Sequence, residues 1–90
     1  MKFVPVNKKV GERIRRYRQL VGLNQESVAE EIGMSGGNFG KIERGEIDIN
    51  TESLEKLAKL FKIQVASFFD DRPVLGISEK NQNYGYASQT

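Results

Sequence analysis

Apolar residues recur three or four positions apart along most of this chain, a spacing that predicts amphipathic helices rather than strands. The first stripe predicts a helix that begins at Asn7 or Lys8 and ends before Gly22, a natural helix stop. Another stripe predicts a helix over residues 51–61, behind Asn50 as its N-cap. The inward residues are Val10, Ile14, Tyr17 and Val21 in the first helix and Leu54, Leu57, Ala58 and Phe61 in the other.

Two shorter helices are predicted between these, with a tight turn separating them. Asn24 is suited to cap residues 25–32, and Ser35 is suited to cap a helix that reaches Arg44. Gly33 stands at the turn, where the backbone often needs a left-handed residue. The inward residues are Val28, Ala29 and Ile32 in the first helix and Phe39 and Ile42 in the second. Two capped helices joined in this way are typical of a helix-turn-helix, which sets its second helix in the major groove of DNA.

The run V-A-S-F-F predicts a short fifth helix over residues 65–70. Its apolar side chains exceed what so short a helix can bury in a small core, so Phe68 or Phe69 is expected at an interface. The predicted organisation is one domain over residues 7–70 followed by a tail over residues 71–90.

The two ends of the chain carry no helical stripe. Beyond Pro73 the composition becomes polar and rich in Gly, Ser and Asn, which predicts a flexible tail. Residues 1–6 are apolar and contain a proline, so they are expected to be extended. Residues 74–77 are a candidate strand, to be paired with Phe3 and Val4 or with their copy in a second subunit.

Ninety residues suffice for one domain with a small core. The chain has no Cys and no His, which excludes disulfides, the usual nitrogen or sulfur metal sites and histidine-based catalysis. No serine therefore has a histidine to activate it, and we expect neither an enzyme nor a cofactor. No apolar run is long enough to span a bilayer or to serve as a signal peptide, so a cytoplasmic protein is expected.

The charge is unevenly distributed, although the net charge is only +2. Residues 8–18 hold six basic residues and only one acidic residue, Glu12. A basic segment beside a helix-turn-helix is what attraction to DNA phosphates would require. A solvated helix face explains such a run equally well when charge is considered alone, and the neighbouring motif favours DNA.

Five stretches resemble the Cro/CI-type (XRE) family of helix-turn-helix proteins, in the order in which the family has them. They read G-E-R-I-R-R-Y-R, L-N-Q-x-x-V-A-x-x-I-G-M-S, I-E-R-G, S-L-E-K-L-A-K-L-F and V-A-S-F-F. The resemblance covers residues 10–69, and five elements in order are far more specific than one capped helix pair. It implies an all-α, five-helix lambda-repressor-like DNA-binding domain, here followed by a polar C-terminal tail.

The resemblance also implies roles for individual residues. Gln25 stands where the family places a phosphate-contacting glutamine, at a helix N-terminus whose N–H groups also favour phosphate. Arg18 and Glu43 match a family ion pair that ties the first helix to the third and has a structural role. The alternative for that pair is two exposed charges of little consequence. The family's base-facing positions are held by Gly36, Gly37 and Lys41, and Asn38 and Arg44 lie near the sugar–phosphate backbone.

Glycine at two of the three base-facing positions departs from the family pattern, and Gly40 weakens the same helix further. Three explanations remain open. The backbone approaches the groove closely and Ser35, Asn38 and Lys41 read the bases; or DNA shape and phosphate contacts supply specificity; or the helix does not read DNA. Two acidic residues in the following loop, Glu46 and Asp48, weigh against DNA, since a phosphate-facing loop would prefer lysine.

The leading hypothesis is a sequence-specific transcriptional regulator, a repressor that binds a palindromic operator as a homodimer. Its dimer contact would come from the fifth helix and the tail, through Phe68 and Phe69. The alternative is a protein-interaction module, such as the antitoxin of a toxin–antitoxin pair or an adaptor that has kept the fold. The glycine-rich third helix and the tyrosine-bearing tail favour that alternative.

Overall fold

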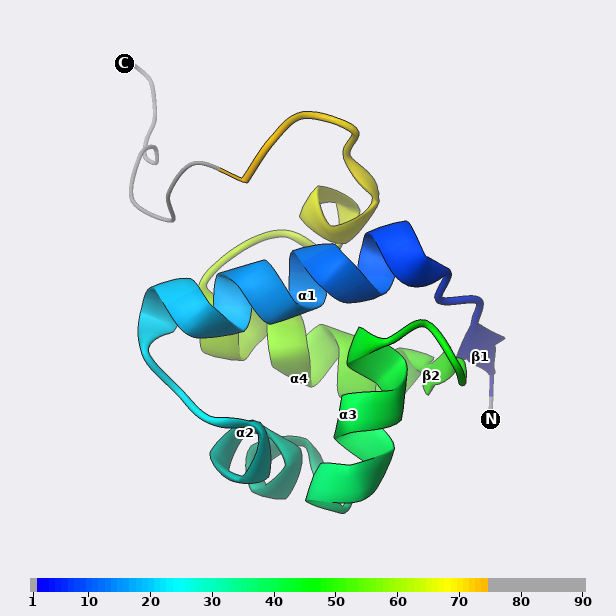
Figure 1. Cartoon of the computed structure of the whole chain (residues 1–90), viewed down its shortest axis with the longest axis vertical. Helices are drawn as coiled ribbons and strands as arrows, with labels where there is room; N and C mark the ends of the chain where they lie inside the picture. The colour runs from blue at the N-terminus through cyan, green and yellow to red at the C-terminus, as the bar shows by residue number, and fades with distance from the viewer. Residues whose placement is uncertain (1, 75–90) are drawn as a thin grey trace.

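Figure 1 shows the computed structural model, which describes residues 2–74. The helices of this part are α1 (Lys8–Val21), α2 (Gln25–Ile32), α3 (Gly36–Glu43) and α4 (Thr51–Phe61), followed by the 3₁₀ helix η1 (Val65–Phe69). Two short strands, β1 (Phe3–Val4) and β2 (Ile49–Asn50), complete it. The predicted tail beyond residue 74 and most of the candidate strand over residues 74–77 lie outside the described residues.

Helices α2, α3 and α4 begin at the caps that the sequence predicts, and α1 begins after Asn7, which also proves to be a cap. The side-chain oxygens of Asn7, Asn24 and Asn50 each accept a backbone N–H three residues on, at 2.8 Å. Ser35 caps α3 in the same way, at 3.1 Å from the N–H of Asn38. These bonds satisfy backbone donors that have no partner within the helix, so local chemistry sets where each helix starts.

The core lies where α1 and α4 meet α2, α3 and η1. In Figure 1, η1 lies on one side of α1 and α2 and α3 lie on the other. Tyr17, Phe61 and Phe68 form an aromatic cluster with ring centroids 5.9–6.3 Å apart, which joins α1, α4 and η1. Phe68 meets both other rings edge-to-face, while Tyr17 and Phe61 are stacked, and such contacts stabilise a core beyond the area that they bury. The inward residues predicted for the four α-helices are buried, except Val21, which is partly buried.

The structure corrects the fifth helix and the purely helical fold class, and it narrows the choice between Phe68 and Phe69. The fifth helix is the five-residue 3₁₀ helix η1, so the domain has four α-helices within residues 2–74. Phe68 is fully buried in the aromatic cluster, because a 3₁₀ helix laid across α1 and α4 turns this ring inward; of the two phenylalanines only Phe69 is exposed, at 43%. The fold is not purely helical either, since β1 pairs with β2.

The β1–β2 pair is antiparallel, with Phe3 opposite Asn50 and Val4 opposite Ile49. Hydrogen bonds on either side of it hold the N-terminus against the start of α4. Thr51 donates both its N–H and its hydroxyl to the carbonyl of Lys2, at 2.9 and 3.0 Å. Asp48 accepts the N–H of Val6 at 3.2 Å, which gives this acidic loop residue a structural partner.

Residues 70–74 return along α1, and Arg13 holds them there. Its guanidinium donates to the carbonyls of Ser67 and Arg72 and lies over the ring of Tyr17. The hydrogen bonds that Arg72 donates to Asp70 lower the pKa of that carboxyl well below its usual range. Among the described residues, no helix combines the length and the apolar character needed to cross a membrane.

Candidate nucleic-acid interface

The C-terminal end of α3 meets the first turns of α1 in direct backbone contact. A Cβ atom on Gly11 would lie only 2.5 Å from the carbonyl oxygen of Glu43 and 2.6 Å from that of Ile42. Gly45, just after α3, has a left-handed φ of 74°, and a Cβ there would lie 2.6 Å from the N atom of Lys8. Since the opposing atoms are backbone, neither glycine can be enlarged without moving a helix.

A buried ion pair holds the same end of α3. Arg18 donates from Nε and Nη2 to the two carboxylate oxygens of Glu43, at 2.6 and 3.2 Å, and from Nη1 to the carbonyl of Leu23 at 2.9 Å. The side chains of Arg18 and Glu43 are only 12% and 2% exposed. Because two hydrogen bonds join the guanidinium to the carboxylate, the pair fixes both the position and the orientation of α3 relative to α1. A single exposed ion pair would not do this.

Gln25 belongs to this network. Its amide donates to Glu43 Oε1 at 2.8 Å, so the side chain at the start of α2 is turned toward α3. Gly40 makes room for it, because a Cβ on Gly40 would lie 3.4–3.5 Å from the Gln25 amide and 3.3 Å from Arg44 Nη1. The sequence pointed to Gln25 as a phosphate ligand but did not indicate that its amide is shared with the buried carboxylate.

The outer face of α3 carries few side chains near its start. Asn38 and Lys41 are exposed on it, while Ser35 serves as its cap. A Cβ on Gly37 would meet nothing within 4 Å, and one on Gly36 would lie 3.1 Å from Cγ of Glu26. Of the three positions expected to face bases, only Lys41 therefore presents a functional group.

Arg44 follows α3 and is more than half exposed. It donates from Nε to Glu46 at 2.9 Å, and this hydrogen bond lowers the pKa of Glu46 and raises that of Arg44. The acidic loop after α3 thus holds an arginine beside the outer face of that helix.

A small cavity of about 240 Å³ opens where the second half of α1 meets the start of α2 and the end of α3. It is lined by Arg15, Arg18, Gln25, Glu43 and Arg44. The sequence did not single out Arg15 as a DNA contact, although Arg15 lies in the basic stretch over residues 8–18 and on the same side of α1 as Arg18. The cavity therefore combines a helix N-terminus with exposed arginines, a combination that suits a phosphate group. Residues 2–74 contain no cluster of three or more residues that could hold a metal ion.

Comparison with known proteins finds that the family model described as Helix-turn-helix matches residues 14–68. Among curated proteins, an uncharacterized HTH-type transcriptional regulator from Sinorhizobium medicae is 30% identical over 69 residues, which cover 77% of this chain. The matched region spans 50% of that protein, so this chain corresponds to about half the length of such relatives.

Two solved structures resemble the fold and share appreciable sequence. The restriction-modification controller protein C.AhdI from Aeromonas hydrophila superimposes with a TM-score of 0.65 and 32% identity, covering 69% of this chain and 94% of the other. The P22 c2 repressor, in complex with a synthetic operator, gives a TM-score of 0.62 and 29% identity, covering 66% of this chain and 89% of the other.

Proposed function

This chain belongs to the helix-turn-helix family that includes the Cro/CI-type repressors, and on that premise we propose that it regulates transcription by binding double-stranded DNA at a specific operator. The observation that carries this proposal is the arrangement at α3. Its exposed Lys41 and Asn38 lie on an outer face, while Arg18 and Glu43 hold its other end rigidly against α1. A recognition helix, which contacts base edges in the major groove, needs such a rigid support. Base contacts require side chains that are placed to within a fraction of an ångström.

The proposed contacts divide into two kinds. Ser35, Asn38 and Lys41 read base edges, and the glycines Gly36 and Gly37 allow the backbone of α3 to approach the groove closely. Gln25 and Arg44 bind phosphates at the rim of the cavity beside α3. A lysine binds guanine and an asparagine binds adenine, so the operator half-site is expected to contain both bases.

We propose further that the protein acts as a repressor and binds a palindromic operator as a homodimer. The similarity to the P22 c2 repressor, which was solved on a synthetic operator, supports this proposal. Two reading helices would then enter successive major grooves about 34 Å apart. Of the residues first considered for the dimer contact, Phe69 keeps that proposed role, because Phe68 is needed in the core of each protomer.

The alternative of an antitoxin or adaptor gains no support from the comparisons. The relatives described here are named as a transcriptional regulator, a restriction-modification controller and a repressor.

Fluorescence anisotropy tests the proposal. Labelled duplexes that tile the region upstream of the gene would be titrated with the protein across a salt series, with random duplexes of equal length as controls. A specific regulator should bind one tile at least about a hundredfold more tightly than the random duplexes, and binding to both should weaken steeply with salt. The same, weak affinity for every duplex would contradict sequence-specific binding.

Lys41→Ala separates base reading from phosphate attraction in the same assay. If Lys41 reads a base, its loss lowers affinity for the preferred tile by about 1–3 kcal/mol and leaves random duplexes nearly unaffected. A loss of the same size on every duplex would show that Lys41 contacts only phosphate.

A further inference from the structure

A second and larger cavity lies along α1, on the side where residues 71–74 return. It is a groove of about 490 Å³, and its lining includes five basic residues and two acidic residues. The basic residues are Lys9, Arg13, Arg15, Arg16 and Arg72. The acidic residues are Glu12 and Asp71. The groove therefore carries a net positive charge, in a protein whose net charge is only +2.

Most of the charges in this groove already have partners. Lys9 pairs with Asp71 at 2.8 Å, and Arg72 pairs with Asp70. Arg13 donates to backbone carbonyls, where it holds residues 67–72 in place. By contrast, Arg15 and Arg16 are exposed and form no ion pair or hydrogen bond with any side chain of residues 2–74. Within the groove, these two arginines are therefore the cations that remain available to an anion.

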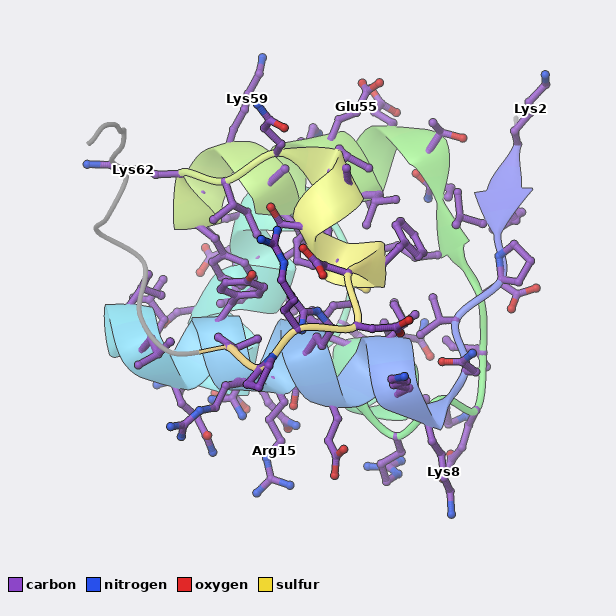
Figure 2. All side chains as sticks on the ribbon, turned by 90° about the horizontal axis from the view of Figure 1, so that it is seen from above. Lys2, Lys8, Arg15, Glu55, Lys59 and Lys62 are labelled. Atoms are coloured by element: carbon purple, nitrogen blue, oxygen red, sulfur yellow. The ribbon has the colours of Figure 1, made fainter. Side chains whose placement is uncertain are left out.

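Arg15 lines both the groove and the smaller cavity beside α3. The two cavities thus share one side chain, and a continuous basic path runs from Arg44 through Arg15 to Arg16. Figure 2 shows Arg15 and Lys8 projecting from α1 on the side away from α4, whereas Lys59 and Glu55 project from α4 in the opposite direction. Lys8 and Arg15 therefore lie on one face of α1, and Arg15 joins that face to the cavity at which Gln25 meets α3.

We propose that Arg15 and Arg16 bind DNA phosphates. Contacts with the DNA backbone would then extend beyond the helix-turn-helix, along α1 and into the groove beside residues 71–74. This inference rests on the proposed DNA binding. It adds a phosphate track, by which we mean the phosphate-binding pair Arg15 and Arg16, on a helix outside the motif. An arginine fork suits this role, because it donates two hydrogen bonds to one phosphate. Of the two acidic side chains in the groove, Asp71 is neutralised by Lys9, whereas Glu12 forms no ion pair within residues 2–74 and is outnumbered by Arg15 and Arg16, one turn further along α1.

The test compares two substitutions that remove the same charge from opposite faces. Arg15→Gln removes a cation from the proposed track, and Lys59→Gln removes one from the far side of α4. Both residues are exposed, so both variants are expected to fold, which circular dichroism would verify. Affinity for the preferred tile and for a random duplex would be measured by anisotropy across a salt series.

Arg15→Gln is expected to weaken binding to both duplexes equally, by roughly three- to tenfold, as the net loss of one ordinary hydrogen bond at an exposed site predicts. The slope of log affinity against log salt should fall by about 0.9 for each phosphate that the variant no longer neutralises. Arg15→Lys should restore the slope but not all of the affinity, since lysine keeps the charge and lacks the fork. Arg16→Gln should resemble Arg15→Gln, and Lys59→Gln should leave the slope unchanged.

The inference is overturned if the wild-type protein binds DNA and Arg15→Gln matches Lys59→Gln in both affinity and salt slope. A wild-type protein that binds no duplex would overturn the proposed function as well. A loss confined to the preferred tile would also contradict the phosphate track, since it would assign Arg15 to base reading.

Discussion

The two halves of α3 differ in almost every physical respect. In the C-terminal half, Ile42 and Glu43 are buried, and their carbonyl groups lie against Gly11 of α1. In the N-terminal half, Gly37 has open space around it and Asn38 is exposed. The C-terminal half is therefore a rigid anchor, whereas the N-terminal half, apart from the buried Phe39, presents an outer face with few structural contacts. A DNA-reading helix can vary the second half without disturbing the first, which suggests how a common fold accommodates different operators.

The largest effect is expected from breaking the anchor at its ion pair. Glu43→Ala leaves Arg18 buried without its carboxylate partner, which should lower the free energy of unfolding by about 3–5 kcal/mol. Urea denaturation followed by circular dichroism would measure it. As a control, the double change Arg18→Met with Glu43→Leu should recover much of the loss, because it leaves no buried charge unpaired. A loss below about 1 kcal/mol for Glu43→Ala would show that the pair contributes no more than an exposed one.

A smaller loss is expected where α1 and α3 touch. Gly11→Ala should destabilise the fold by about 1–3 kcal/mol, since its Cβ would meet the carbonyl oxygen of Glu43 at 2.5 Å. On helix propensity alone the same change should stabilise α1 by up to about 1 kcal/mol, so the sign of the effect is diagnostic. Thermal unfolding at neutral pH would decide it, and a raised melting temperature would refute the close approach of the two helices.

The open half of α3 should respond in the opposite direction. Gly37→Ala places a Cβ where nothing lies within 4 Å, so only the gain in helix propensity remains. The expected result is an increase of about 0.5–1 kcal/mol in the free energy of unfolding, measured beside Gly11→Ala under the same conditions. Destabilisation by Gly37→Ala would mean that this end of α3 is more constrained than the structure indicates.

The smallest effect concerns the loop that follows the anchor. The hydrogen bond from Arg44 lowers the pKa of Glu46 below its ordinary value of 4.5. Because the folded pKa is the lower one, the pair stabilises the fold above about pH 4.5, and this contribution is lost as the pH falls through the folded pKa of Glu46. An NMR titration of the Glu46 carboxyl would show a midpoint below 4.5, and Arg44→Gln should move it back toward 4.5. Equal midpoints in the two proteins would argue against the pair.

Local chemistry accounts for the parts of the fold that could be predicted. Asn7, Asn24, Ser35 and Asn50 cap the helices within three residues of their own position, so a short stretch of sequence contains all that is needed. Gly22 and Gly33 end helices for a similarly local reason, because glycine readily adopts the left-handed φ angles of 78° and 80° found there. The pair of Arg18 and Glu43 was reached only through resemblance to a family, since no local rule joins residues so far apart.

The sequence by itself determined where the α-helices begin and end and which of their faces turn inward, because both depend on interactions within a few residues. Only the tertiary structure decided that Phe68 lies in the core, that β1 pairs with β2, and that Gln25 turns its amide toward Glu43. It also decided that Arg15 lines two cavities at once. These facts depend on distances between segments that are remote in the chain, and such distances follow from how the helices pack rather than from any one helix.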